Sequence, residues 1–202
     1  TPTPLLTGKM ERIIANPMWY VPKKIAVQEI LPKLKTDSTY LLRNGFKVLD
    51  KNHKVVNTSD LDMANMNEKD FDYTFRQNRG TDNSLGQVKF IFSNPYAVYL
   101  HDTPSKSLFA KDLRAFSHGC VRVQHPERLA NYILRHFNSD TTDFSGLMQA
   151  GKHREFTIQS SLPITITYIT CEGDDKGHLY FYKDIYGRDD KELEYLAQFM
   201  GI

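Results

Sequence analysis

The residues "AFSHGCVRV", numbers 115 to 123, place a histidine, a glycine and a cysteine in a row. Cys120 is one of two cysteines in the 202 residues, and the histidines that precede it most closely are His118 and His101. A thiolate is a strong nucleophile, but an ordinary thiol with a pKa of about 8.5 is mostly protonated at neutral pH. A nearby histidine can take that proton and later return it to a leaving amine. The pattern indicates covalent catalysis by Cys120, with His101 or His118 as the base.

The neighbours of Cys120 leave room for this chemistry and for two alternatives. Gly119 removes a side chain where backbone N–H groups must approach a substrate carbonyl, and such groups can stabilise an oxyanion. A lone cysteine can also be a small buried hydrophobic residue. A zinc site would use His101, His118, Cys120 and His125. Their spacing matches no zinc-finger or zinc-ribbon pattern, and the chain has no CxxC.

Two short β-rich runs must position these residues. "QVKFIFS" (87–93) and "AVYLH" (97–101) are separated by Asn-Pro, which predicts a hairpin whose second strand ends on His101. Alternation along that strand places Tyr99 on the same face as His101. Further strands are predicted at 154–159, 163–172 and 178–184, and helices at 23–34, 126–137, 141–151 and 189–202. In the helix at 126–137, the spacing places Leu129, Tyr132, Ile133 and Phe137 on the core face.

Composition narrows the possible functions. Hydrophobic residues make up 40% of the chain and aromatic residues 12%, which is ordinary for a globular protein. The net charge is +2, and lysine and arginine are scattered rather than clustered, so we expect no nucleic-acid partner. The chain contains no recognisable signal peptide and no apolar stretch of the roughly 20 residues that a membrane span needs.

"SHGCVRV", preceded by "YLHDTP", resembles the signature of the YkuD-type L,D-transpeptidases. "PMWYVP", "ILPKL", "NSLGQVKFIF" and "LHDTPSKSLF" are similar to the large periplasmic members of Gram-negative bacteria, which carry a helical insertion over the active site. The resemblance implies a mostly β fold, a sandwich or barrel-like catalytic domain with peripheral helices. It divides the chain into a catalytic domain (1–22 and 71–202), lacking its first strands, and a helical lid (23–70). It also implies a periplasmic location and membrane association of the full-length protein through a signal or anchor absent from this chain.

The resemblance assigns roles to residues of the motif. It implies Cys120 as nucleophile and His101 as general base and then acid, in preference to His118, which would tune the thiol or shape the loop. Asp102 would orient His101 through its backbone carbonyl or its side chain, two alternatives that the sequence leaves open. The remaining candidates are Gly119 for the oxyanion and Tyr99, Ser117 and Arg122 for substrate binding.

The implied reaction is transpeptidation of peptidoglycan stem peptides. Cys120 would attack a donor tetrapeptide, release D-alanine and pass the acyl group to a diaminopimelate amine, which gives a 3→3 cross-link. Carbapenems would be covalent inhibitors, and no cofactor or metal is implied. The alternatives are an L,D-carboxypeptidase or cysteine peptidase that uses water, and a non-catalytic peptidoglycan-binding fragment. We expect Cys171 to be structural and both thiols to be free, with Trp19 and Tyr20 at the contact between lid and catalytic domain.

Overall fold

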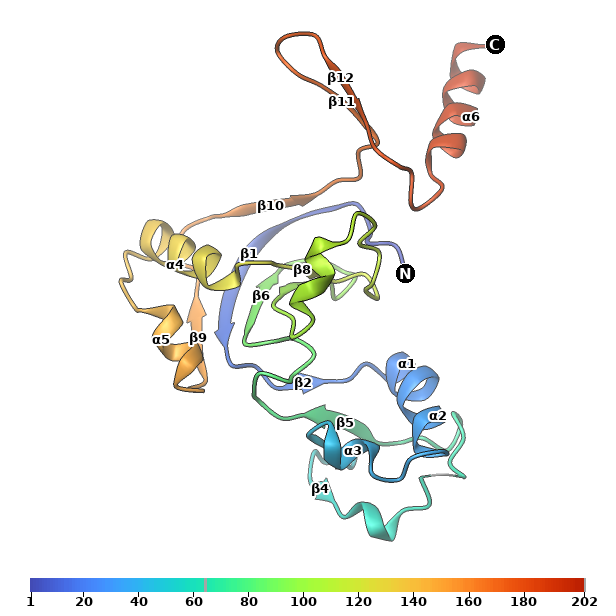
Figure 1. Cartoon of the computed structure of the whole chain (residues 1–202), viewed down its shortest axis with the longest axis vertical. Coiled ribbons are helices and arrows are strands. Elements are labelled where there is room, and N and C mark those ends of the chain that lie inside the picture. The colour runs from blue at the N-terminus through green and yellow to red at the C-terminus, as the bar shows by residue number, and fades with distance from the viewer. Residues whose placement is uncertain (64, 202) are drawn as a thin grey trace.

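A curled sheet and a smaller lobe make up the computed structural model, which describes residues 1–63 and 65–201 (Figure 1). The sheet has the order β10-β1-β6-β7-β8, with β9 also pairing with β1. Its strands are β1 (Leu6–Ala15), β6 (Val88–Phe92), β7 (Leu100–His101), β8 (Val121–Arg122), β9 (Arg154–Thr157) and β10 (Pro163–Ile166). The expected mostly β fold with short helices is confirmed.

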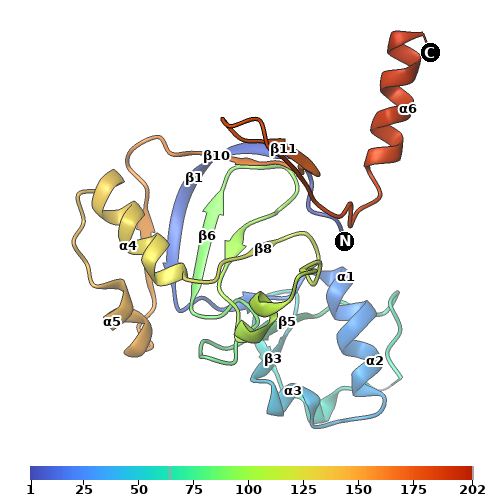
Figure 2. The ribbon, with the colours of Figure 1, turned by 45° about the horizontal axis from the view of Figure 1, so that its top comes forward.

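Strand β1 curls the sheet because it changes partner along its length. Its first residues pair with β10 and its last residues with β9, while a shift of register between Met10 and Arg12 interrupts its pairing with β6. Such an irregularity bends a strand. The curvature is visible in Figure 2. All of these pairs are antiparallel, whereas the last pair, β7 with β8, is parallel.

Two helices cover one face of the sheet and close the first core. They are α4 (Pro126–Phe137) and α5 (Phe144–Gln149), both near their predicted positions. The predicted face of α4 is wrong in part, because Tyr132 is exposed while Ala130, Ile133 and Leu134 are the buried residues. These pack with side chains of β1, β6 and β9, among them Ile13, Val88, Phe90 and Phe156. This core holds β1, β6 and β9 in place, and β6 in turn pairs with β7, which ends on His101.

The smaller lobe, which we call the second lobe (residues 19–77), contains a sheet as well as helices. Its strands, in the order β2-β5-β3-β4, are β2 (Trp19–Tyr20), β5 (Thr74–Gln77), β3 (Phe46–Leu49) and β4 (Val55–Val56). Residues 23–70 are therefore not only helical. The polar stretch 50–70 supplies the buried Met63. The division of the chain at residues 22 and 71 stays a prediction, since β2 and β5 lie outside 23–70.

The helical part of the second lobe includes a proline. The segments are α1 (Lys23–Ile25), the π-helical turn η1 (Ala26–Ile30), α2 (Leu31–Leu34), α3 (Tyr40–Arg43) and the 3-10 turn η2 (Thr58–Asp60). Pro32 lacks an N–H and disrupts a regular helix. Just before it, the Leu31 N–H reaches back five residues to the Ala26 carbonyl. The wide turn keeps the chain helical, so that Ala26, Ile30, Leu31 and Leu34 all pack into the second core.

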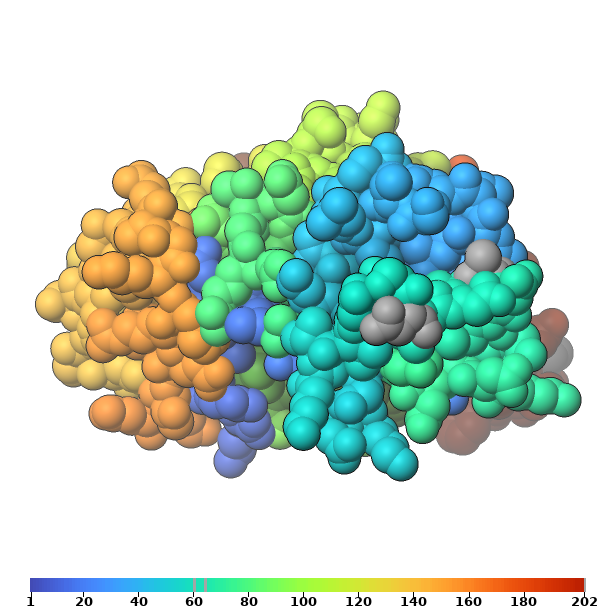
Figure 3. All heavy atoms as spheres, turned by 90° about the horizontal axis from the view of Figure 1, so that it is seen from below, coloured from blue at the N-terminus to red at the C-terminus, as the bar shows by residue number. Residues whose placement is uncertain are grey.

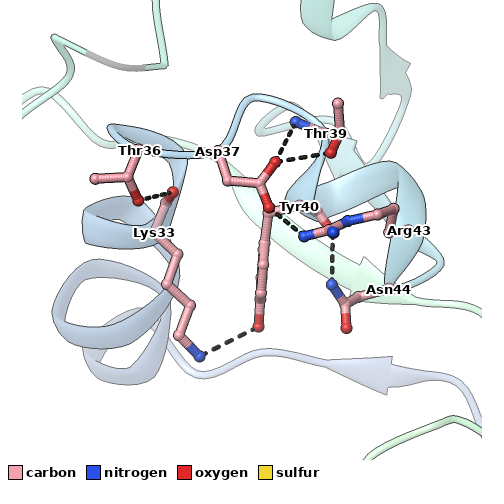
Figure 4. Close-up of polar contacts among 7 residues, drawn as sticks. All are labelled: Lys33, Thr36, Asp37, Thr39, Tyr40, Arg43 and Asn44. Atoms are coloured by element: carbon pink, nitrogen blue, oxygen red, sulfur yellow. Dashed lines mark hydrogen bonds and ion pairs between the residues drawn. The ribbon is translucent and has the colours of Figure 1, made fainter.

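A polar network fastens the turn between α2 and α3 (Figure 4). The Asp37 carboxylate accepts hydrogen bonds from the Thr39 N–H and hydroxyl and pairs with Arg43. These contacts lower the pKa of Asp37, the Thr39 hydroxyl most of all. Asp37 thereby orders the turn before α3.

The chain beyond β10 lies outside both cores. The run 163–172, expected as one strand, divides into β10 and β11 (Cys171–Gly173), and β11 pairs with β12 (Leu179–Phe181) in a separate hairpin. The last helix, α6 (Asp189–Met200), projects from the sheet in both views (Figures 1 and 2). Among the described residues, none of the helices combines the length and the apolar character needed to cross a membrane.

Candidate active site

The parallel pair β7 and β8 brings the cysteine beside the histidine strand. Leu100 lies opposite Val121, and His101 lies opposite Arg122. The Val121 N–H donates to the carbonyl of Tyr99 over 3.1 Å, which places Cys120 level with Tyr99. Because paired residues in a sheet point to the same face, the side chains of Tyr99, His101, Cys120 and Arg122 share one face.

His101 is held as a neutral base. Its ring is buried, with 6% of the residue exposed, and its Nδ1–H donates to the Asp102 carbonyl over 2.5 Å. Burial is the largest cause of a pKa lowered to about 4, while the hydrogen bond with Asp102 acts in the opposite direction. The tautomer with a proton on Nδ1 leaves Nε2 as an acceptor. His101 can thus accept a proton at neutral pH.

The Asp102 side chain has partners other than the imidazole. Its Oδ2 accepts from the Gln87 N–H at 2.9 Å, and its Oδ1 pairs with the Lys106 ammonium. A Cβ on Gly86 would lie 2.3 Å from the same carboxylate. The carbonyl of Asp102 therefore contacts the imidazole, while its carboxylate fastens the loop before β6 to β7.

The Cys120 thiol is half-buried and free. Burial raises its pKa above the ordinary value, while hydrogen bonds from the backbone and side chain of Tyr99, and the charge of Lys89, act in the opposite direction. The Lys89 ammonium lies 3.9 Å from the centre of the Tyr99 ring. Tyr99 is half-buried and packs edge-on against His101. Burial raises its pKa. At rest the thiol is protonated, and it becomes a thiolate only when a base removes the proton.

The loop before Cys120 turns His118 away from the sulfur. Gly119 has φ +113°, a conformation open to glycine and strained for other residues, and its N–H donates to the Ser117 hydroxyl over 3.3 Å. His118 Nε2 instead pairs with the Glu29 carboxylate of η1. Its ring is therefore tied to the second lobe. The role of the Gly119 N–H towards an oxyanion stays a prediction.

A cavity of about 640 Å3 opens beside the cysteine. Cys120, Ser117 and Arg122 contribute to its wall, together with Arg114 and apolar side chains of the 3-10 turn η3 (Lys106–Ala110) and of β10. Two buried nitrogens of Arg122, Nε and Nη1, have no hydrogen-bond partner among the described residues. The cavity thus offers guanidinium groups to an anionic ligand next to the thiol.

The comparison with protein families agrees with this arrangement. The profile described as "YkuD: L,D-transpeptidase catalytic domain" matches residues 1–158, which include Cys120 and His101. The chain belongs to the YkuD family. It is also 33% identical over 187 residues to a Haemophilus influenzae protein named "Putative L,D-transpeptidase". The match covers 93% of this chain and 38% of that relative.

YkuD enzymes are cysteine-dependent L,D-transpeptidases that act on peptidoglycan peptides. The zinc alternative has no support in the geometry. Within residues 1–63 and 65–201, no three His, Cys, Asp or Glu side chains gather as a metal site. Two of the histidines considered as zinc ligands face carboxylates instead. His125 Nδ1 lies 3.9 Å from Glu127 Oε1, and His118 Nε2 pairs with Glu29 Oε1.

Sequence reasoning missed three residues around the YkuD site. Lys89 reaches it because its strand position pairs with His101, and alternation along the predicted strand 87–93 could have indicated this. Glu29 and Trp19 come from the second lobe; a hydrogen bond from the Trp19 side chain to Tyr99 lowers the pKa of that tyrosine. No local sequence signal marks them. Trp19 was expected only at the contact between lid and catalytic domain, while Tyr20 is exposed.

Proposed function

We propose that this YkuD domain is a peptidoglycan L,D-transpeptidase that forms 3→3 cross-links through a thioester on Cys120. One observation carries the proposal. The neutral His101, with Nδ1 fixed on the Asp102 carbonyl, shares a sheet face with a half-buried thiol. This combination can move one proton from sulfur to a leaving amine without a cofactor.

The acylation step follows from these protonation states. His101 Nε2 takes the proton of the Cys120 thiol as sulfur attacks the carbonyl carbon of the third residue in a donor tetrapeptide. The C–N bond to the terminal D-alanine then breaks, and the imidazolium returns the proton to the departing amine. The donor is left as a thioester on Cys120. His101 ends neutral, as it began.

The transfer step reverses the direction of the proton. A diaminopimelate amine of a second stem peptide attacks the thioester, and His101 Nε2 takes a proton from the attacking nitrogen. The C–S bond breaks, the proton returns to sulfur, and the cross-linked product leaves. Water in place of the amine would give a carboxypeptidase with the same residues.

Arg122 supplies recognition in this proposal. Arg122 lines the cavity next to Cys120, and its buried Nε and Nη1 have no hydrogen-bond partner among the described residues. A guanidinium can hold a carboxylate by two hydrogen bonds. Both the terminal D-alanine and diaminopimelate carry such a group. Ser117 lines the same cavity and would contact the peptide, whereas Tyr99 would act on the thiol rather than on the substrate.

Product analysis tests the proposed function. The purified chain is incubated with a tetrapeptide donor, with and without a second stem peptide that bears a free amine, and the products are identified by mass spectrometry. We expect D-alanine and a 3→3 dimer, both lost in Cys120→Ser and in His101→Gln and both retained in Cys171→Ala. D-alanine without a dimer would identify the carboxypeptidase instead. A peptide that binds unchanged would identify a non-catalytic binding fragment.

A carbapenem provides an independent test of the nucleophile. The Cys120 sulfur would add to the lactam carbonyl, the ring C–N bond would break, and the nitrogen would take the proton from His101. We expect the protein mass to increase by the whole drug, with the label on the peptide that contains Cys120. An unmodified mass would contradict the proposed acyl-enzyme.

We also propose that the full-length protein works in the periplasm and is associated with a membrane. The support is chemical, since peptidoglycan peptides are assembled into the wall outside the cytoplasmic membrane. The measurement is fractionation of cells that produce the full-length protein. Recovery of the protein in the cytosol would contradict the proposal.

A further inference from the structure

The second lobe contacts the loop that carries the nucleophile. His118 Nε2 pairs with Glu29 Oε1, and both side chains are about half exposed, at 51% and 43%. A pair this exposed contributes little to the stability of the fold. Its position is the more informative property, because His118 is two residues from Cys120.

The backbone on each side fixes the two partners of this pair. On the lobe side, Ala26 and Ile30 of η1 are buried in the second core, which leaves Glu29 of the same turn on the surface. On the loop side, Gly119 stands between His118 and Cys120 with a positive φ. One side chain therefore faces the second lobe, while the other lies on the sheet face with His101.

The pair also directs the His118 ring toward the second lobe. His118 Nε2 donates to the Glu29 carboxylate, so this nitrogen faces η1 rather than the thiol. His101, whose Nε2 is an acceptor, lies on the sheet face with Cys120. The lobe has a second link to the same centre, through the hydrogen bond of Trp19 with Tyr99, which itself contacts Cys120.

We propose that Glu29 is a positioning residue of the second lobe, which holds the Ser117–Cys120 loop in its reactive conformation through His118. The inference rests on the proposed acyl transfer and extends it. In its absence the fold remains, but the loop samples conformations in which the sulfur is displaced from His101. The sulfur then becomes more accessible to small reagents and less reactive toward a bound acyl donor.

Two rates test the proposal in opposite directions. In Glu29→Ala, we expect acylation by a carbapenem to slow about fivefold to tenfold. We expect alkylation of Cys120 by iodoacetamide to become faster in the same variant. The melting temperature should stay unchanged, since the pair is exposed. Glu29→Gln keeps an oxygen that accepts from His118, and it should recover most of the acylation rate.

The matched control is Glu68→Ala, which removes an exposed carboxylate elsewhere in the second lobe. It should leave both rates at their wild-type values. A cycle with His118→Ala locates the effect: if Glu29 acts through His118, the double variant is no slower in acylation than either single variant. Every protein of the alkylation series also carries Cys171→Ala, so that Cys120 is the one thiol that iodoacetamide can modify.

The outcomes separate this inference from the proposed function. Normal acylation in Glu29→Ala, or losses that add in the double variant, would overturn the positioning role and leave the transpeptidase proposal intact. A wild-type chain that carbapenems do not acylate would contradict the proposed function. In that case the alkylation rates still decide the position of the loop, because they need no substrate, and equal rates in wild type and Glu29→Ala would reject it.

Discussion

At the scale of single residues, the centre rests as an uncharged pair. Burial lowers the pKa of His101 to about 4 and raises the pKa of the Cys120 thiol. Both shifts disfavour the charged form, so a thiolate–imidazolium pair is not the resting state. In the proposed reaction the thiol is ionised during attack, when His101 accepts its proton. This arrangement keeps the sulfur less reactive toward solutes until a substrate is in place.

The first prediction concerns the dependence of stability on pH. His101 has a pKa of about 4 when folded and 6.5 when unfolded, so the unfolded chain binds more protons between these values. The free energy of unfolding should therefore fall by about 3 kcal/mol as the pH drops from 6.5 to 4. Urea denaturation at a series of pH values measures it. His101→Gln should show a flatter dependence in this window, and equal slopes would contradict the assignment.

The second prediction separates the two parts of Asp102. In Asp102→Asn the carbonyl that holds His101 is unchanged, whereas the ion pair with Lys106 is lost. We expect kcat to change by less than about threefold, and the free energy of unfolding to fall by about 1 to 3 kcal/mol. Steady-state kinetics and denaturation measure the two quantities. A loss of kcat by orders of magnitude would mean that the carboxylate orients the imidazole.

The sequence points to the proposed reacting residues more directly than to the residues around them. Cys120 and His101 follow from residue types and a recognisable motif. The identity of the Asp102 group that contacts His101 depends on a backbone angle, and no residue letter records it. Glu29 and Lys89 reach the site through lobe packing and strand register, which are long-range properties.

At the scale of elements, the site depends on how β6 joins β7. Gly86 precedes β6 with φ +58°, and its missing side chain leaves space for the Asp102 carboxylate, which accepts from the next N–H along the chain, that of Gln87. The loop before β6 is thereby fastened to the end of β7. A side chain at Gly86 would push on Asp102 and could shift the backbone carbonyl that contacts His101.

The third prediction uses this close approach. Gly86→Ala places a Cβ 2.3 Å from Asp102 Oδ2 at a strained φ, and we expect a loss of about 2 to 4 kcal/mol together with a lower kcat. The matched control is Gly45→Ala, which has φ +66° but no atom within 4 Å of the added Cβ. It should lose about 1 kcal/mol, with kcat unchanged. Denaturation and kinetics of both variants are compared, and equal losses would exclude the clash.

Elements with strong local patterns were predicted and elements that need distant partners were not. The hairpin 87–101 and the helix 126–137 have clear periodicity, and both are present. The strands of residues 23–70 were missed because β3 and β4 are short and their partner β5 follows after a long polar stretch. The predicted buried face of α4 differs from the observed one because Tyr132 was counted as apolar, although the residue is exposed at the surface.

At the scale of the whole molecule, two separately cored bodies meet at the catalytic loop. Seen from below, the second lobe lies to one side and the segment around α5 and β9 to the other (Figure 3). The cavity beside Cys120 is closed by residues from beyond the matched range 1–158, among them Ile166, Tyr168 and Tyr186. The C-terminal segment therefore belongs to the site, although it lies outside the family match.

The last prediction compares two truncations of the C-terminal segment. Among the described residues of α6 none is buried, and Leu193, Leu196 and Met200 are 54% to 62% exposed. Removing residues 190–202 should change the free energy of unfolding by less than about 0.5 kcal/mol and leave KM unaltered. Denaturation and steady-state kinetics check both. A larger loss of stability would mean that the apolar face of α6 is covered in solution.

A longer truncation should behave differently because it opens the cavity. Removing residues 169–202 deletes Ile185 and Tyr186 from the cavity wall. Tyr168 remains but loses Tyr186, the ring that stacks on it. Cys120, His101 and their hydrogen bonds remain, so we expect KM for the donor peptide to rise about tenfold while kcat changes little. An equal fall of kcat and kcat/KM would indicate that the C-terminal segment acts on the transition state rather than on substrate binding.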